Sequence, residues 1–299
     1  MAKTKWTSEN ITSQEGKIVI ITGSSSGLGK EASRVLAGKG AEIIMAVRNT
    51  TKGEAAAKEI QKEFPNADIK VMMLDLGSLK SVKAFADKFS QQYNKLDILI
   101  NNAGVMMCPY SKTEDGFEIQ MGTNHLGHFA LTGYLMPLLK NTEGSRLVVT
   151  ASIAHNMGNI DFSDINWEKR KYNTSRAYGD SKLANLYFMK ELVRKLNGES
   201  NAPMVLAAHP GVTDTELTRH SKIFKFFNVF FSQNVVRGTL PTLRAATDPD
   251  ANPGDYYGPK GFMEMKGYPV KVDSNKLSKD ANLAQQLWSL SEEMTGVKY

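Results

Sequence analysis

The sequence predicts a single-domain α/β fold, in which a doubly wound parallel sheet carries helices on both faces. Two observations predict it. Short, continuous apolar segments, typical of strands that are buried on both faces, recur from residue 17 to residue 208. Segments with helical periodicity separate them, as the right-handed crossovers of a parallel sheet require. No linker rich in Pro, Gly or Ser divides the 299 residues, so one domain is expected.

The first strand is expected at residues 17–22, where Lys-Ile-Val-Ile-Ile-Thr precedes a glycine. The other apolar segments interpreted as strands are residues 41–47, 69–74, 97–100, 146–150 and 204–208. The first helix is expected at residues 29–37, because Ala32, Val35 and Leu36 would share one side of it.

Beyond residue 211 the alternation of strands and helices changes. Residues 256–259 are interpreted as an edge strand and residues 281–294 as a closing helix. Residues 1–16 are expected to form an N-terminal extension and residues 17–299 the domain itself, with a substrate lid at about residues 213–233.

Charge and composition limit the classes of function. The net charge is +6, but the basic residues are interleaved with Glu and Asp, which argues against a nucleic-acid partner and is compatible with attraction of a phosphate-bearing cofactor. The single Cys108 excludes an internal disulfide and a thiolate zinc site, and the five histidines lack metal-ligand spacing, so no metal is expected.

The hydropathy pattern bears on location. Residues 1–14 lack the apolar core of a secretory signal, and no segment approaches the roughly 18 apolar residues of a membrane span. A cytoplasmic protein without a transmembrane segment is therefore expected.

A glycine-rich turn lies between the first expected strand and the first expected helix. Backbone amides and a helix N-terminus converge at such a turn, where dinucleotide-binding Rossmann folds hold a pyrophosphate. The spacing Gly-xxx-Gly-x-Gly differs from the common G-x-G-x-x-G pattern, and a merely tight turn is the alternative. The residues expected to contact the cofactor here are Gly23, Ser25, Ser26, Gly27, Leu28 and Gly29.

The end of the second expected strand distinguishes between the two nicotinamide cofactors. An acidic residue there would bind the ribose 2′-hydroxyl of NAD, but this sequence has Arg48, followed by Lys52 one helical turn later. A guanidinium suits a 2′-phosphate, so we expect NADP(H). The alternative is a solvated arginine at the start of a surface helix.

Tyr178 and Lys182 lie four residues apart in an expected helix, where side chains share one face. A phenol titrates near pH ~10 and needs a neighbouring cation to work as an acid or base at neutral pH. Alone, this spacing is more typical of a helix surface pair. Ser152 changes that interpretation, because it ends the fifth expected strand at the edge where open α/β sheets bind ligands.

Small and polar residues follow the fourth expected strand at the same edge. Asn102, Ala103 and Gly104 would let a cofactor ring pass close to the backbone, although an ordinary polar strand end is the alternative. Asn124 lies inside an expected helix, where an amide side chain is mildly unfavourable, and this suggests a buried, water-binding role.

Together and in this order, the motifs resemble those of the short-chain dehydrogenase/reductase family, over residues 17 to about 211. The long gap between Ser152 and Tyr178 is similar to the retinol-dehydrogenase-like branch. The remaining motifs that carry the resemblance are Asp75-Leu76, Pro210-Gly211, residues 124–132, His155, residues 181–185 and residues 209–217.

The resemblance implies roles for these residues. Asn124, Ser152, Tyr178 and Lys182 would form a catalytic tetrad, with Tyr178 as the acid or base. Lys182 would also hold the nicotinamide ribose. Asp75 and Leu76 would border the adenine. The residues implied to border the nicotinamide are Pro210, Gly211, Val212 and Thr215.

The function so implied is hydride transfer between NADP(H) and a carbonyl or alcohol group. An aromatic segment, residues 222–231, lies in the expected lid and favours an apolar aldehyde, ketone or alcohol as substrate, with contact to a membrane surface as the alternative. Two other functions stay open at this point: a non-catalytic NADP(H)-binding regulatory or scaffold protein, and a C=C reductase of the protochlorophyllide-reductase type. Members of the family often form homodimers, and the oligomeric state of this chain stays open. The identity of the substrate and the direction of the reaction stay open as well.

Overall fold

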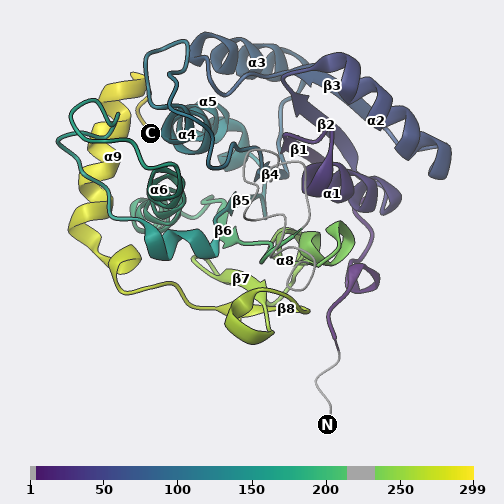
Figure 1. The fold of residues 1–299 in the computed structure, drawn as a ribbon. Helices are drawn as coiled ribbons and strands as arrows, with labels where there is room; N and C mark the ends of the chain where they lie inside the picture. Colours follow the sequence, from purple (N-terminus) through teal and green to yellow (C-terminus); the bar gives the residue numbers. More distant parts are fainter. Residues whose placement is uncertain (1–4, 214–232) are drawn as a thin grey trace.

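The computed structural model describes residues 5–213 and 233–299 (Figure 1). One sheet has the strand order β3-β2-β1-β4-β5-β6-β7-β8, and all neighbouring strands pair in parallel except β7 and β8. The strands are β1 (Ile18–Thr22), β2 (Glu42–Val47), β3 (Ile69–Met73), β4 (Ile98–Asn101), β5 (Arg146–Thr150), β6 (Met204–Ala208), β7 (Tyr256–Pro259) and β8 (Pro269–Val272).

Helices cover both faces of the sheet (Figure 1). Helices α1, α2 and α8 pack on one face, α3, α5 and α6 pack on the other, and α9 lies against α6. The helices are α1 (Gly27–Gly38), α2 (Thr50–Glu63), α3 (Leu79–Gln92), α4 (Ile119–Met121), α5 (Gly127–Lys140), α6 (Thr174–Lys195), α8 (Val235–Thr247) and α9 (Ala281–Thr295). The short turns are η1 (Ser8–Asn10), η3 (Ile153–Met157), η5 (Phe262–Glu264), η6 (Leu277–Lys279) and the π-helical η2 (Gly122–Leu126).

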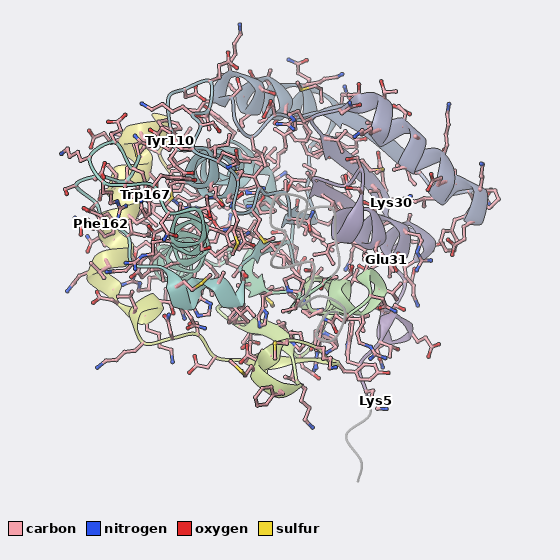
Figure 2. The ribbon with its side chains drawn as sticks, in the orientation of Figure 1. Lys5, Lys30, Glu31, Tyr110, Phe162 and Trp167 are labelled. Carbon is pink, nitrogen blue, oxygen red and sulfur yellow. The ribbon has the colours of Figure 1, made fainter. Side chains whose placement is uncertain are left out.

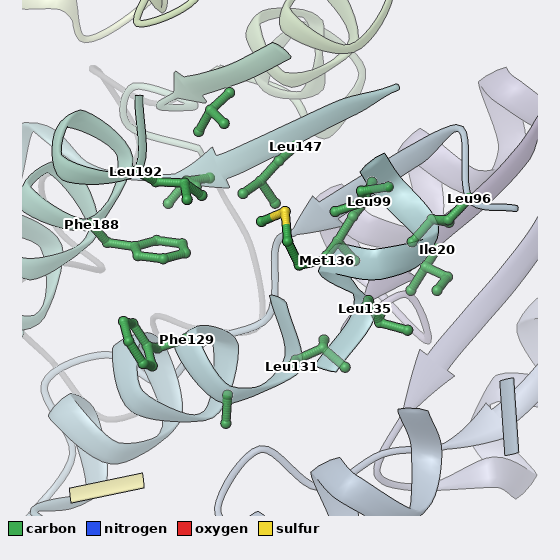
Figure 3. Packing of buried hydrophobic residues seen from close by; sticks show 14 of the residues in the cluster. Ile20, Leu96, Leu99, Phe129, Leu131, Leu135, Met136, Leu147, Phe188 and Leu192 are labelled. Carbon is green, nitrogen blue, oxygen red and sulfur yellow. The ribbon is translucent and has the colours of Figure 1, made fainter. Parts of the chain in front are cut away.

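Strands β1, β2, β4, β5, β6 and β7 are buried on both faces along nearly all of their length, as their apolar sequences predict, whereas β3 and β8 are only partly buried. Ile21 packs among the residues beneath α1 and α8, whereas its neighbour Ile20 packs among those beneath α3 and α5. On the latter side, Phe129 of α5 and Phe188 of α6 pack with Leu147 of β5 (Figure 3). Burial of one such side chain contributes about 1.5–3 kcal/mol, so the central strands are rigid supports for whatever follows their ends.

The expected fold class is confirmed, and each predicted strand of the first two thirds is present within one residue of its expected bounds. The expectation that residues 256–259 form an edge strand is wrong. β7 lies between β6 and β8, and the edge is β8, which pairs with β7 antiparallel. The sequence gives little sign of β8, because it is short, begins at a proline and is only half-buried along most of its length.

Part of the expected N-terminal extension packs on the domain. Ile11 of the expected N-terminal extension is buried near α1, and the Gln14 amide donates to the Lys39 carbonyl at 2.8 Å.

Thr213 and Gln233, the ends of the expected lid, form a parallel bridge. The lid's interior, including Thr215 and the aromatic residues 222–231, lies outside the described residues. No helix within the described ranges is long and apolar enough to cross a membrane.

Candidate active site

The structure brings the expected site residues to one edge of the sheet. The glycine-rich turn follows β1, Asn102 to Gly104 follow β4, Ser152 follows β5 and Pro210 follows β6. Since these strands are parallel, their carboxyl ends meet at the same edge. Helix α6 packs against β5 and β6 and carries Tyr178 and Lys182.

The turn after β1 is built for a close approach of backbone segments. Gly23 has a φ of +67°, and a side chain at Gly29 would come within 2.6 Å of the Gly23 carbonyl oxygen. Ser26 precedes α1 without capping it through its side chain, so the first amides of the helix face the turn without a side-chain acceptor. Such amides, with the positive end of the helix dipole, suit a pyrophosphate.

A buried network connects this turn to the segment after β4. The Thr22 hydroxyl oxygen accepts the amides of Asn102 and Ala103, each at 2.9 Å, and lies 2.9 Å from His128 Nε2. His128 Nδ1 lies 3.0 Å from the Asn124 carbonyl, which can only accept, so Nδ1 carries the proton and Nε2 accepts from Thr22. Burial lowers the pKa of His128 to about 4, which keeps the ring neutral.

Asn124 lies in the π-helical turn η2, an irregularity that is frequent at functional sites. It is fully buried, and its side chain bonds within the protein: Oδ1 accepts the Val105 amide at 2.8 Å, and Nδ2 donates to Ser181 Oγ at 2.9 Å. The Asn124 main-chain carbonyl lies 3.0 Å from His128 Nδ1. Binding of a water by Asn124 stays a prediction.

Two cations lie where the expected 2′-phosphate would bind. Arg48 directly follows β2, Lys52 lies in the first turn of α2, and both are exposed. In residues 5–213 and 233–299 neither forms an ion pair with a carboxylate. Between them, Asn49 caps α2 by accepting the Lys52 amide at 2.9 Å. The end of β2 thus offers positive charge and no carboxylate.

At the end of β3, Asp75 is half-buried, and its Oδ1 accepts the Gly77 amide at 2.9 Å. Leu76 is buried, and its carbonyl oxygen would lie 2.4 Å from a side chain at Gly127, so the start of α5 packs tightly on this segment. Contact of Asp75 and Leu76 with adenine stays a prediction.

Tyr178, Lys182 and Ser152 form the centre of the site. Tyr178 is 8% exposed and Lys182 is 4% exposed. Lys182 Nζ donates to the Thr150 carbonyl at 3.1 Å and lies 5.7 Å from the centre of the Tyr178 ring. Ser152 Oγ accepts the Ala154 amide at 3.1 Å, which leaves its hydroxyl hydrogen to donate to the neighbouring Tyr178 phenol or to a bound molecule.

Burial sets the protonation of this centre. It raises the pKa of Tyr178 to about 12, against the opposing effect of the nearby Ser152 hydroxyl, and it lowers the pKa of Lys182 to about 8. The sequence led us to expect that Lys182 would supply the cation that favours the phenolate. Desolvation is the largest effect on the phenol, and Tyr178 is held in its protonated, proton-donating form.

The lowered pKa of Lys182 predicts an effect on stability. Below pH 8 the lysine is charged both in the fold and in the unfolded chain, and the buried charge is the less favourable of the two. Lys182→Met should abolish turnover, yet raise the free energy of unfolding at pH 7 by about 1–3 kcal/mol. The Thr150 carbonyl keeps its bond from Asn185 Nδ2 at 3.0 Å.

The difference in free energy of unfolding between Lys182→Met and the wild type should depend on pH. Between pH 8 and 10.5 the folded wild type releases the proton that the unfolded chain still binds, so the advantage of Lys182→Met should shrink across this range. Urea unfolding at pH 7 and pH 10 measures it. A variant that is less stable at pH 7, or a difference that does not change with pH, would count against this assignment.

Two glycines bring the Ser152 segment against α6. A side chain at Gly158 would lie 2.6 Å from the Gly179 carbonyl, and one at Gly179 would lie 2.9 Å from the Ala154 carbonyl. The chain between Ser152 and α6 then forms a loop that bears Phe162 and Trp167 (Figure 2), and the Tyr110 hydroxyl donates to the Asn166 carbonyl of this loop at 3.3 Å. The long gap in the sequence is thus an ordered loop that packs on the segment after β4.

The segment after β6 is held from the side of β7 and β8. Gly211 has a φ of +67°, and the Val212 amide donates to the Met265 carbonyl at 2.8 Å. Pro210 accepts from Gln233 Nε2 at 2.7 Å. Buried His209 lies 2.8 Å from the Glu264 carboxylate, a contact between distant residues that no sequence pattern indicates.

Sequence reasoning overlooked the roles of Thr22 and Thr150, whose oxygens anchor the Asn102 segment and Lys182. Both end strands that lead into the site, which was the available signal. In the described part of the chain, no cluster of three or more His, Cys, Asp or Glu side chains is arranged to hold a metal.

Comparison with known proteins agrees with this arrangement. The family model for short chain dehydrogenase matches residues 17–224. Retinol dehydrogenase 12 of Mus musculus is 43% identical over 288 residues, which cover 95% of this chain and 88% of the relative.

Solved structures give the same result. An uncharacterised protein of Mycobacterium paratuberculosis has 41% sequence identity and a TM-score of 0.84, with 99% of both chains covered. RhlG of Pseudomonas aeruginosa, solved as an NADP active-site complex, has 25% identity and a TM-score of 0.56, over 70% of this chain and 77% of that one. With the family model and the relatives, these structures lead to one conclusion: the chain belongs to the retinol-dehydrogenase-like branch of the short-chain dehydrogenase/reductase family, whose members are oxidoreductases that act on alcohol or carbonyl groups.

Proposed function

We propose that this protein is an NADP(H)-dependent oxidoreductase that interconverts an apolar carbonyl compound and its alcohol, with Tyr178 as the acid or base. The observation that carries the proposal is the buried Tyr178 and Lys182 beside Ser152 at the carboxyl edge of the sheet. A scaffold protein that only bound the cofactor could use Lys182 on the ribose, but it would have no use for the buried phenol of Tyr178 beside Ser152.

The cofactor would lie across this edge. The amides at the start of α1 would hold the pyrophosphate, and Arg48 with Lys52 would hold a 2′-phosphate. Gly104 packs closely against Asn124, because a side chain there would come within 2.9 Å of Asn124 Oδ1. NADP in the active site of RhlG supports the choice of cofactor.

When bound, the nicotinamide supplies or accepts the hydride. In the direction of reduction, Tyr178 donates its phenol proton to the substrate oxygen, while the Ser152 hydroxyl donates a hydrogen bond to the same oxygen as negative charge develops on it. Lys182 binds the ribose hydroxyls, and its positive charge favours the phenolate that remains. Asn124 would hold a water through which Lys182 and Tyr178 regain the proton.

The segment after β4 supports an apolar substrate. Val105, Met106 and Met107 are half-buried beside Asn124, and their side chains are apolar. The name of the Mus musculus relative refers to retinol, an apolar alcohol. A panel of apolar aldehydes, ketones and alcohols, with retinal and retinol included, tests the proposal by following NADPH absorbance. We expect substrate-dependent oxidation of NADPH; cofactor binding without turnover on the whole panel would favour a scaffold.

A further inference from the structure

The backbone of Ser152 is held by a buried histidine three residues later. His155 Nδ1 lies 2.6 Å from the Ser152 carbonyl oxygen, and the His155 amide donates to the same oxygen at 3.0 Å. A carbonyl oxygen only accepts, so Nδ1 carries the proton. Ser152 is therefore fixed at both its carbonyl, by His155, and its hydroxyl, by the Ala154 amide.

The second ring nitrogen of His155 also forms a hydrogen bond. Nε2 lies 3.3 Å from the Asn275 backbone nitrogen, which can only donate, so Nε2 accepts. The ring is 3% exposed and packs edge-on against the Tyr256 ring, with 6.2 Å between centroids. Both nitrogens and the ring plane are thus determined by neighbours, and the imidazole is neutral in one tautomer.

We infer that His155 is a positioning residue for catalysis: its Nδ1 proton fixes the turn that aims the Ser152 hydroxyl at the substrate oxygen beside Tyr178. The inference rests on the proposed function. It assigns His155 no contact with substrate or cofactor. Because a displacement of about 1 Å can cost a catalytic group about 10²-fold in rate, a single hydrogen bond to the Ser152 carbonyl is sufficient to matter.

Substitution of His155 by Asn or by Gln tests the roles of the two ring nitrogens separately. In His155→Asn, the side-chain amide can donate from the position of Nδ1, so the bond to Ser152 is kept. In His155→Gln, the amide reaches the position of Nε2 and the bond to Ser152 is lost. Both variants remove the ring from Tyr256, so each is the packing control of the other. We expect kcat to fall about 10-fold to 100-fold in His155→Gln and less than about threefold in His155→Asn, with equal NADPH Kd and melting temperature.

His155→Asn and His155→Gln, each combined with Ser152→Ala, distinguish a positioning role of His155 from a structural role. Without the hydroxyl there is nothing to aim, so the two His155 variants should have single-turnover rates within about twofold of each other. A merely structural histidine would lower the rate by the same factor in both backgrounds.

Three results would overturn the inference. These are wild-type kcat in His155→Gln, an equal loss in both His155 variants when both are folded, and an undiminished difference between them in the Ser152→Ala background. If the wild type itself fails to turn over the carbonyl panel, the proposed function falls and the inference with it. Wild-type turnover that is unaffected by His155→Gln would overturn the inference alone.

Discussion

Tyr178→Phe is expected to lower kcat by about 10³-fold, which is within the range of a lost general acid. The substitution removes one oxygen from a side chain that is already almost fully buried, so the fold should not change. The phenol lies within hydrogen-bond reach of Ser152, and phenylalanine has no proton to donate. NADPH should bind with unchanged Kd, which fluorescence titration measures.

A second tyrosine on the same helix provides the control. The Tyr187 hydroxyl donates to the Leu277 carbonyl at 3.1 Å, on the side of α6 that packs against the C-terminal segment. Tyr187→Phe should cost about 1 kcal/mol of stability and leave kcat unchanged. Near-normal turnover by Tyr178→Phe, or an equal loss in both variants, would contradict the assignment of Tyr178.

Arg48→Ala is expected to raise KM for NADPH about 10-fold to 100-fold while it leaves KM for NADH nearly constant. The guanidinium is exposed at the end of β2, and loss of a hydrogen bond between charged groups costs about 1.5–3 kcal/mol. Only NADPH carries the 2′-phosphate that this group would bind, so the ratio of kcat/KM values for the two cofactors is the informative quantity.

Lys58→Ala is the matched control, because it removes one positive charge from an exposed position of α2, the helix that begins two residues after Arg48. A general effect of charge would change KM for NADPH in both variants alike. Parallel changes of KM for NADPH and NADH in Arg48→Ala would also refute the assignment, and would leave the choice between the two cofactors to other residues.

Much of the fold could be predicted because its central strands are buried on both faces. Ile18–Thr22 and Arg146–Thr150 are continuous apolar segments, and such segments have few alternatives in a chain that also has helical periodicity between them. β8 escaped prediction because it is short and half-buried, so its pattern resembles that of a loop.

The site was predictable to the extent that parallel strands end at one edge. Ser152 and the glycine-rich turn come together for this reason alone. The contacts that hold them were not predictable. The bond of His128 to Thr22 depends on a tautomer, and that of Lys182 to Thr150 depends on the π-helical turn and glycine contacts that bring α6 close to the strand ends. Burial, which raises the pKa of Tyr178, is likewise a property of the packed molecule.

Hydride transfer is the central claim, and an isotope label tests it most directly. Two preparations of NADPH, each with deuterium on a different face of the nicotinamide C4, are incubated separately with the protein and each carbonyl of the panel. The alcohol products are then analysed by mass spectrometry. We predict that deuterium from one face only appears on the carbinol carbon of an apolar product. Absence of deuterium from every product, or its appearance equally from both faces, would contradict the claim.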